Sequence, residues 1–342
     1  MHVAAAQREQ FISEVSSKYR SAAFKATLQR VARFARDDTA PILLQGESGT
    51  GKTTLARHAH ALSTRAAGPF QHVVLSTLDD GLASSELFGH VVGAFTDARR
   101  PRAGHFASAS GGTLFLDEIG KTSRALQGKL LHALEYGEIR PVGSDRDMRI
   151  SARVIAATNV DLAVLVDEDV FLPDLHARLE TFRIVLPPLR ERRADIPLLV
   201  DESLRRHAAA AGYSGAIPSL AESVLAAFQR AEWPNNLRQL DATVHRLLLE
   251  AEGAMTITFD YCVEELAYLR EEAATPLTRE RVDDALSRAG SVSGAARLLG
   301  VDRTTVYRFQ RRNDAAALAV APHAIHLPST AAPHRQQFER NQ

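Results

Sequence analysis

The chain has 342 residues, of which 45% are hydrophobic, so it is long enough for two or three domains with buried cores. The charges of its 41 basic and 41 acidic side chains cancel, so the protein as a whole does not attract a polyanion. A surface that binds nucleic acid therefore has to be local. The single cysteine, Cys262, excludes an internal disulfide. The sequence contains no apolar run of about 18 residues, the length that a membrane span needs, so we expect a cytoplasmic protein.

A phosphate-binding motif follows a short N-terminal segment, residues 1–17, and an apolar pattern of helical spacing that ends near Phe34. The run Pro41 to Gln45 predicts a buried strand, and GESGTGKT after it has the spacing of a phosphate loop. Lys52 can reach the β- and γ-phosphates, and the Thr53 hydroxyl can ligate Mg²⁺. A glycine-rich turn that fits by chance is the alternative, but the strand before the motif and the helix after it argue against this. The expected nucleotide-binding residues are Gly46, Glu47, Ser48, Gly49, Thr50, Gly51, Lys52, Thr53 and Thr54.

A pair of carboxylates stands at the end of another predicted strand. Thr113 to Leu116 is apolar, and Asp117 and Glu118 follow it. Parallel-sheet proteins bind ligands at the carboxyl ends of their strands. Asp117 could therefore hold Mg²⁺, and Glu118 could polarise a water molecule for attack on the γ-phosphate. Together with the phosphate loop, these residues predict ATP and Mg²⁺ as ligands, with Lys52 completing the catalytic set.

Two further strands are predicted, Gln71 to Ser76 and Arg153 to Asn159. The second of them ends in two polar residues, Thr158 and Asn159, which could sense a γ-phosphate; a plain strand-end turn is an equal alternative. Because strands alternate with helices, we predict an α/β fold with a parallel sheet over residues 18–194.

Arginines are concentrated between Phe171 and Arg193. Among them, Arg178 could present its guanidinium to a neighbouring subunit's nucleotide and stabilise phosphoryl-transfer charge. We expect three others to be solvated surface residues: Arg190, Arg192 and Arg193.

A helical lid is predicted for residues 195–270, where strand signals end and Ala/Leu-rich helices dominate. Trp233-Pro234 separates two of its helices, because proline cannot continue a helix. Arg238 opens the last helix and could reach the nucleotide; a surface ion pair is the alternative.

A small DNA-binding domain is predicted after a linker at residues 271–277. Residues 278–313 contain three short helical patterns with a glycine in the second turn, and eight arginines against four acids give a local charge of 8 − 4 = +4. This pattern is typical of a helix-turn-helix; a structural helical hairpin is the alternative. The expected DNA-binding residues are Arg303, Thr304, Thr305, Tyr307, Arg308 and Arg311. Residues 314–342 read as a disordered tail.

Ordered sequence blocks give the chain a resemblance to a known family. GESGTGKT, SELFGH, GAFTDA, GGTLFLDEIG, RVIAATN, LPPLRERRADIPLL and WPNNLRQL follow one another as in the bacterial enhancer-binding proteins, the NtrC-like AAA+ activators of sigma-54 RNA polymerase. The C-terminal block, GSVSGAARLLGVDRTTVYRFQRR, is similar to the Fis-type DNA-binding domain of that family.

The resemblance implies an AAA+ fold with a five-stranded parallel sheet, and an ATPase that assembles as a homo-oligomer, usually a hexamer. It implies binding to double-stranded DNA upstream of a promoter and remodelling of sigma-54 RNA polymerase. Thr158 and Asn159 match the family's first sensor, Arg238 the second sensor, and Arg178 an arginine finger acting in trans. The segment that touches sigma-54 would be Gly93, Ala94, Phe95, Thr96, Asp97 and Ala98. The family's receiver domain is not expected here, so control would come from a partner protein in trans, would come from the expression level, or would be absent.

Five positions depart from the family pattern, one of which is Thr53, where the family often has a glutamate. Asp97 replaces a glycine of the contact loop, and Val91 replaces a preceding glutamate. Val74 stands where the family has an asparagine that switches the catalytic glutamate, and Leu172 replaces the first of two finger arginines. These departures keep an alternative open: a sigma-54-independent DNA-binding regulator in which ATP drives oligomerisation.

Overall fold

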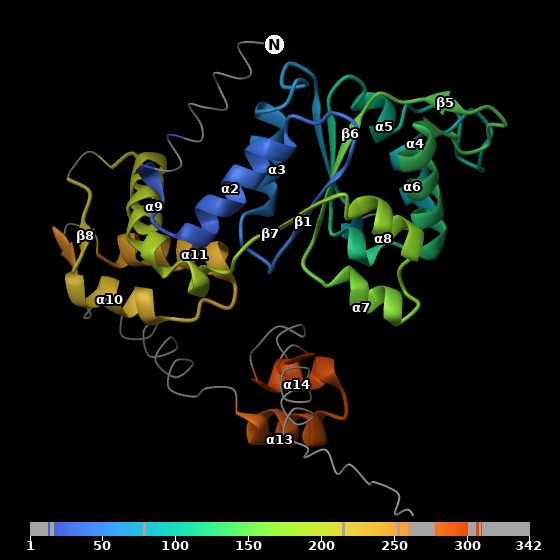
Figure 1. The fold of residues 1–342 in the computed structure, drawn as a ribbon. Helices are drawn as coiled ribbons and strands as arrows, with labels where there is room; N and C mark the ends of the chain where they lie inside the picture. The colour runs from blue at the N-terminus through green and yellow to red at the C-terminus, as the bar shows by residue number, and fades with distance from the viewer. Residues whose placement is uncertain are drawn as a thin grey trace, which may run out of the picture. The chain divides into compact units, whose positions relative to one another are not determined.

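The computed structural model describes residues 13, 17–77, 80–213, 216–251, 254–258, 261, 278–299, 306, 307 and 309. The chain divides into two compact units, Met1–Pro276 and Leu277–Gln342. The first unit consists of a sheet with helices on both faces and a helical lid (Figure 1). In the second unit, the described residues include the helices at 279–289 and 292–299, which a tight turn joins.

A five-stranded parallel sheet organises the first unit, in the order β2-β3-β6-β1-β7. Its strands are β1 (Ile42–Gln45), β2 (Phe70–Val74), β3 (Thr113–Asp117), β6 (Arg153–Thr158) and β7 (Phe182–Val185). Every residue of β1 and β6 is buried, as expected for central strands of a sheet covered on both faces. The predicted fold class is confirmed. The sequence patterns marked four of the five strands; the fifth, β7, lies inside the arginine-rich stretch.

Helices cover both faces of the sheet (Figure 1). Along β1 the side chains alternate between the two faces: Ile42 and Leu44 pack with Phe24, whereas Leu43 packs with Leu130. One face is covered by α2 (Ala22–Phe34) and α3 (Lys52–Ala61). The other face is covered by α4 (Asp80–Phe88), α5 (His105–Ser108), α6 (Arg124–Tyr136), α7 (Leu162–Asp167) and α8 (Pro173–Leu179). The sheet and these helices bring the phosphate loop and the ends of β3 and β6 to one edge.

Short elements connect these layers. They are the 3-10 turns η1 (Leu75–Thr77), η2 (Ile119–Lys121), η3 (Leu189–Glu191) and η4 (Arg193–Asp195), and the antiparallel pair β4 (Glu138–Ile139) and β5 (Met148–Arg149).

The lid has a hydrophobic core of its own. Its helices are α9 (Ile196–Ala210), α10 (Glu222–Arg230) and α11 (Asn236–Glu250), and two short strands, β8 (Ser219–Leu220) and β9 (Thr256–Ile257), pair in parallel. Trp233 is completely buried in this core, and its indole N–H donates to the Phe228 carbonyl at 2.7 Å. Helix α10 ends before Trp233-Pro234 and α11 begins after it, as the sequence predicts.

The second unit contains α13 (Arg279–Ala289) and α14 (Val292–Leu299). Thr278 caps α13, and Gly290 ends it with φ of 64°. Val282 and Val306 are buried against each other, and residues 306, 307 and 309 are helical. Of the predicted DNA-binding residues, Tyr307 is within the described part of the chain. Arg303, Thr304, Thr305, Arg308 and Arg311 lie outside the described residues, as do Cys262 and the tail 314–342.

Candidate functional site

The phosphate loop connects β1 to α3 through backbone conformations that require glycine. Gly49 has φ of 76° and Gly51 has φ of 101°, which L-amino acids with side chains rarely adopt. Gly51 directly precedes α3, whose first N–H groups have no partner within the helix. A helix N-terminus after a tight glycine turn is a place where an anion binds.

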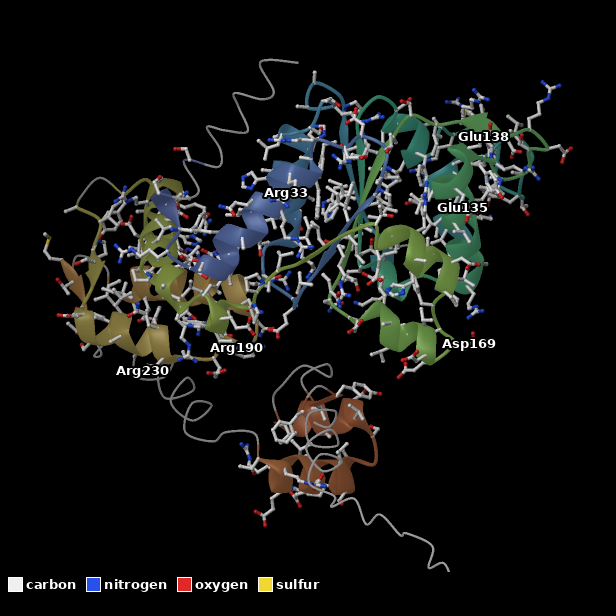
Figure 2. The ribbon with its side chains drawn as sticks, in the orientation of Figure 1. Arg33, Glu135, Glu138, Asp169, Arg190 and Arg230 are labelled. Carbon is white, nitrogen blue, oxygen red and sulfur yellow. The ribbon has the colours of Figure 1, made fainter. Side chains whose placement is uncertain are left out.

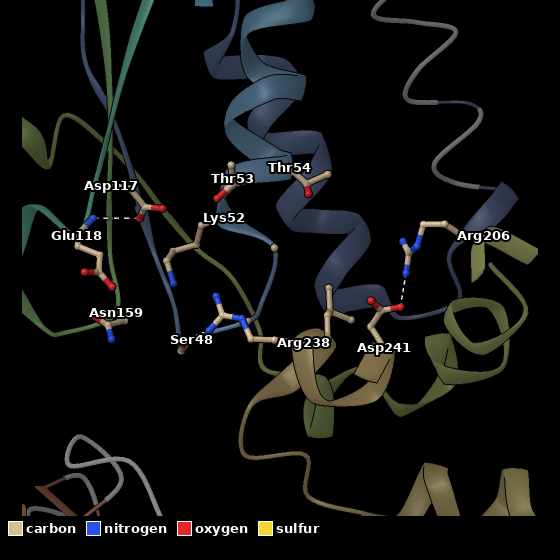
Figure 3. Close-up of a pocket in the computed structure, with 13 residues that line it drawn as sticks. Ser48, Lys52, Thr53, Thr54, Asp117, Glu118, Asn159, Arg206, Arg238 and Asp241 are labelled. Carbon is tan, nitrogen blue, oxygen red and sulfur yellow. Dashed lines mark hydrogen bonds and ion pairs between the residues drawn. The ribbon is translucent and has the colours of Figure 1, made fainter. Parts of the chain in front are cut away.

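A cavity of about 380 Å³ opens beside this loop. It brings together the loop, the two carboxylates at the end of β3, Asn159 and the start of α11 (Figure 3). Its lining residues are Ser48, Gly49, Gly51, Lys52, Thr53, Thr54, Asp117, Glu118, Asn159, Arg206, Leu237, Arg238 and Asp241. Four of these come from the lid: Arg206, Leu237, Arg238 and Asp241. Leu237 and Arg238 belong to the WPNNLRQL block, whereas Arg206 and Asp241 belong to no motif in the sequence.

Lys52 reaches back across the loop. Its ammonium donates to the carbonyl oxygens of Gly46 at 2.8 Å and Glu47 at 2.9 Å. Burial lowers the pKa of Lys52, while the nearby carboxylates of Asp117 and Glu118 oppose that shift. The lysine is thus a partly desolvated cation bonded to neutral oxygens.

The two carboxylates have different surroundings. The Oδ1 atom of Asp117 accepts from the backbone N–H of Glu118 at 3.0 Å, and His72 Nε2 lies 3.6 Å from Oδ2. Glu118 has a left-handed backbone with φ of 60° and accepts from Lys121 Nζ at 2.9 Å. Hydrogen bonds from Ser76 and then from Lys121 lower the pKa of Glu118, so this carboxylate is ionised at neutral pH.

Ser76 is a partner of Glu118 that the sequence did not reveal. Val74 ends β2 directly opposite Asp117, and its hydrocarbon side chain cannot form a hydrogen bond. Two residues further on, the turn η1 brings the Ser76 hydroxyl to the Glu118 carboxylate. A polar contact to this glutamate therefore exists despite the valine.

The two polar residues predicted at the end of β6 have different surroundings: one faces the cavity, and the other belongs to the turn that ends the strand. Asn159 lines the cavity, whereas Thr158 is completely buried. The Thr158 hydroxyl donates to the Val160 carbonyl and accepts from the Val160 N–H, both at 3.1 Å. Its side chain thus serves the strand-end turn, and Asn159 is the one that faces the cavity.

Three loop residues that we expected to bind nucleotide lie outside the cavity lining. Thr50 is 2% exposed and its hydroxyl donates to the Glu47 carbonyl at 2.8 Å. Gly46 donates its N–H to the Thr158 carbonyl at 3.1 Å. The Glu47 carboxylate forms a bidentate ion pair with Arg190, at 2.7 and 2.8 Å.

Two of the three arginines between β7 and the lid are paired inside the structure and are not solvated. The prediction that Arg190 and Arg192 are solvated is wrong: Arg190 pairs with Glu47, and Arg192 is 2% exposed and pairs with Asp195 at 3.3 Å. For Arg190, the reason is that its partner Glu47 lies 143 residues away in the chain, so no local sequence pattern indicates the pair. Arg192 is close in sequence to its partner, but its guanidinium packs on the ring of the distant Phe24, which no local pattern indicates either. Arg193 forms an exposed pair with Glu232, as expected of a surface residue.

The other two arginines of interest occupy different places. Arg238 lines the cavity, and its Nη1 donates to the Ser48 hydroxyl at 3.1 Å. Arg178, in the last turn of α8, donates from Nε and Nη2 to the Leu134 carbonyl at 3.2 and 3.0 Å. Arg178 is not among the residues that line this protomer's cavity.

A smaller cavity of about 80 Å³ adjoins the first one, because Gly51, Thr54 and Leu237 line both. Its walls are largely apolar and include Tyr19, Leu28, Leu55 and Leu199. The sequence offered no motif for this site, since its walls come from α2, α3 and the lid. Its position allows a flat apolar group to sit next to a phosphate chain held in the larger cavity.

The segment expected to touch sigma-54 forms a closed turn. Gly93 donates its N–H to the Ala98 carbonyl, and Ala98 donates to the Phe95 carbonyl, both at 2.9 Å. Phe95 is 39% exposed and packs edge-on against His90, with ring centroids 4.9 Å apart. Ala94 is half-buried, Thr96 and Asp97 are exposed, and Ala98 is buried.

Two kinds of site are not found in the described part of the chain. Within these ranges, no group of three or more His, Cys, Asp or Glu side chains is placed to hold a metal ion. None of the described helices has the length and apolar character needed to cross a bilayer.

Comparison with known proteins identifies relatives of both parts of the first unit. The family described as "Sigma-54 interaction domain" matches residues 18–185, and "AAA+ ATPase lid domain" matches residues 190–278. The chain is 38% identical to the Nif-specific regulatory protein of Azotobacter vinelandii, over 91% of the chain and 63% of that relative. It is 37% identical to the Nif-specific regulatory protein of Rhizobium leguminosarum bv. trifolii, over 81% of the chain and 76% of the relative.

Two further matches concern a nitric oxide regulator and a solved structure. The chain is 43% identical to the anaerobic nitric oxide reductase transcription regulator NorR of Klebsiella pneumoniae, over 69% of the chain but 45% of that relative. The structure of NtrX from Brucella abortus in complex with ATP aligns with a TM-score of 0.65 at 30% identity, covering 85% of this chain and 67% of NtrX. The chain thus spans about half to two thirds of the length of several curated relatives.

Proposed function

Since the chain belongs to the AAA+ family defined by the sigma-54 interaction domain, we propose that it hydrolyses ATP to remodel sigma-54 RNA polymerase and activate transcription. The observation that carries the proposal is that one cavity joins Lys52, Asp117, Glu118 and Arg238. Phosphoryl transfer needs a cation that binds the phosphates, a carboxylate that holds a metal ion, a base that polarises water and an arginine that approaches from the lid.

The phosphate chain of ATP would lie over the loop. The N-terminus of α3 and the Lys52 ammonium would attract the β- and γ-phosphates. The base would occupy the smaller apolar cavity between Tyr19 and Leu199, which adjoins the loop at Thr54. This arrangement accounts for a polar and an apolar cavity side by side.

The residues present fit Mg²⁺. The Thr53 hydroxyl and the Asp117 carboxylate line the same cavity, and Mg²⁺ prefers oxygen ligands. Protein sites of this kind supply one or two oxygens and leave the rest to phosphates and water, which agrees with the small number of carboxylates here. When bound, the ion would neutralise part of the charge on the phosphates.

Hydrolysis would depend on Glu118 as the residue that orients and polarises the attacking water. Its carboxylate has to exchange at least one of its partners, Ser76 or Lys121, for that water. Asn159 would contact the terminal phosphate from the end of β6, and Arg238 from the lid. Arg178 would act on the nucleotide of a neighbouring subunit, for which its absence from this protomer's cavity lining is a supporting observation.

The proposed partners follow from the loop and from the second unit. Phe95 is the exposed aromatic residue of the segment 93–98 and would make the main contact with sigma-54. Residues 278–313, with eight arginines and four acids, would bind double-stranded DNA at an upstream activating sequence. The active form would be a homo-oligomer, a hexamer, working in the cytoplasm.

Open-complex formation with sigma-54 polymerase, a target promoter and ATP tests this proposal. We expect opening by the wild type and none by Glu118→Ala, which should retain ATP binding. Substituting Arg303 or Arg308 by Ala should weaken DNA binding and leave basal ATPase unchanged. ATP hydrolysis at a normal rate without opening would refute the proposal.

One observation favours a second candidate function. Asp97 is an exposed charge on the contact turn, where a desolvated contact would be disfavoured. The candidate is a DNA-binding regulator that acts without sigma-54 and uses ATP for assembly. This candidate would be supported if ATP promoted oligomerisation and DNA binding while open-complex formation by sigma-54 polymerase stayed unchanged.

A further inference from the structure

A carboxylate in the phosphate loop needs an explanation, because its negative charge opposes phosphate binding. Glu47 is such a residue, yet it is 8% exposed and is absent from the cavity lining. Burial of an ionised carboxylate is costly unless it is paired and hydrogen-bonded. Its partners therefore show what the side chain does.

Two parts of the chain outside the loop meet at this carboxylate. Arg190 comes from η3, in the segment that joins β7 to the lid (Figure 2), and donates from Nη1 and Nη2 to both carboxylate oxygens at 2.8 and 2.7 Å. Asn236, the first residue of α11, donates from Nδ2 to Glu47 Oε2 at 3.2 Å. The same amide group donates to the Ser48 carbonyl at 2.9 Å and accepts from the Leu189 N–H at 2.7 Å.

The backbone of the lid approaches the loop at the same place. Leu237 donates its N–H to the Gly49 carbonyl at 3.0 Å. A Cβ atom on Gly49 would lie 2.2 Å from the Asn235 carbonyl oxygen, so this approach requires glycine. Asn236 adopts a left-handed backbone with φ of 51°, a conformation that asparagine tolerates better than most residues. The start of α11 is thus fixed in position, and Arg238 follows two residues later.

We propose that Glu47 is a positioning residue whose carboxylate clamps the start of α11 to the phosphate loop through Arg190 and Asn236, and so places Arg238 at the terminal phosphate. The consequence for catalysis rests on the proposed ATPase function. The clamp itself consists of protein groups only. A bidentate arginine–carboxylate pair has strict geometry, which suits a positioning role better than a general attraction does.

The pair also changes the electrostatics of the loop. Glu47 raises the pKa of the Arg190 guanidinium through its hydrogen bonds, and Arg190 in turn neutralises the carboxylate. The loop can therefore carry an acid without repelling phosphate. Loss of the pair should then affect the placement of Arg238 more than the affinity for nucleotide.

The test compares Glu47→Gln, Arg190→Gln and the double variant with wild type. The matched control is Arg193→Gln, which removes a neighbouring arginine that pairs with Glu232 at the surface. Amide exchange at Leu237, measured without nucleotide, reports whether α11 is held on the loop. ATPase kinetics and binding of a fluorescent ADP analogue report the consequence for the site.

We expect Leu237 protection to fall about tenfold in both single variants and to be unchanged in Arg193→Gln. The kcat for ATP should fall about tenfold or more, because a misplacement of about 1 Å can cost up to about a hundredfold, while ADP affinity and KM change by less than about threefold. The double variant should be no worse than the worse single variant, since both remove one clamp.

Three results would overturn the proposal. They are unchanged Leu237 protection in both variants, additive losses in the double variant, and a loss of protection spread over the whole first unit, which would indicate a merely structural pair. Absence of ATPase in the wild type would refute the proposed function instead, and Leu237 exchange would still decide whether the clamp exists.

Discussion

Replacing Asp195 by Asn should strongly destabilise the first unit, because it removes the charge from a buried ion pair. Asp195 is 0% exposed, and its Oδ2 pairs with Arg192 Nε at 3.3 Å. Its Oδ1 accepts from the backbone N–H groups of Arg20 and Ser21 at 2.7 and 2.8 Å, so one carboxylate ties the start of α2 to the start of the lid. The asparagine oxygen can still accept both of these bonds, but its NH2 group replaces the oxygen that faces Arg192, so the Arg192 charge is left unpaired.

The magnitude follows from that unpaired charge. Arg192 is 2% exposed, and its guanidinium lies 3.4 Å from the centroid of the Phe24 ring, so water cannot replace the carboxylate. Removing one partner of a buried pair costs about 3–5 kcal/mol. In a unit of this size each kcal/mol lowers Tm by roughly 2–4 °C, which gives a fall of roughly 6–20 °C.

Urea unfolding at pH 7, followed by circular dichroism, measures the effect. The control is Asp201→Asn, which breaks the pair of Asp201 with Arg205 one helical turn into α9, where the two side chains are 53% and 70% exposed. Exposed pairs contribute less than about 1 kcal/mol. Equal losses in the two variants would refute the reasoning that burial sets the cost.

Three further predictions concern the site. Lys52→Ala should abolish binding of a fluorescent ATP analogue. In the wild type, ATP affinity should weaken with rising pH, and the midpoint of that loss should lie below pH 10.5, because burial lowers the pKa of Lys52 and the neutral amine attracts phosphate less. A loss of affinity with its midpoint at or above pH 10.5 would contradict this. Lys121→Met should raise the pKa of Glu118, which is lowered by Ser76 and Lys121 in the wild type, so the acid limb of the ATPase profile should move to higher pH. An unmoved limb would show that another group controls it. Asp97→Gly should increase open-complex formation if the exposed charge weakens the contact, measured with permanganate footprinting at equal ATPase rate; an unchanged yield would mean that the turn makes no contact.

The parts of the site that the sequence predicts are those whose residues are adjacent in the chain. GESGTGKT requires a strand, a glycine turn and a helix in direct succession, and the structure has β1, Gly49 and Gly51 with left-handed backbones, and α3. Asp117 ends β3 and Glu118 follows it, and β3 lies two places from β1 in the sheet. Parallel topology alone then brings both to one edge.

The parts that sequence reasoning missed depend on contacts between distant segments. Arg190 looks like its neighbours until Glu47 is placed beside it, and Ser76 gains its role from a turn that brings it to Glu118. Strand β7 was obscured because its short run, FRIV, includes an arginine and lies at the edge of the sheet, where burial is incomplete. In each case, packing rather than local pattern decides the environment.

The pairing of charges around the cavity shows which cations remain for a phosphate ligand. Three ion pairs neutralise carboxylates in or beside the site: Glu47–Arg190, Glu118–Lys121 and Asp241–Arg206. Each of these cations has a carboxylate partner, so its field at the loop is largely cancelled.

Lys52 and Arg238 differ from those three cations, because the hydrogen bonds that hold them go to neutral oxygens. Lys52 donates to two carbonyls and Arg238 to the Ser48 hydroxyl. A phosphate that displaces these bonds gains the full attraction of each cation and leaves no carboxylate unpaired. Two cations that line the cavity, Lys52 from the loop and Arg238 from the lid, can therefore bind a phosphate without breaking an ion pair. Because Arg238 is placed by the clamp at Glu47, the acid in the loop contributes to phosphate recognition by fixing the position of a cation.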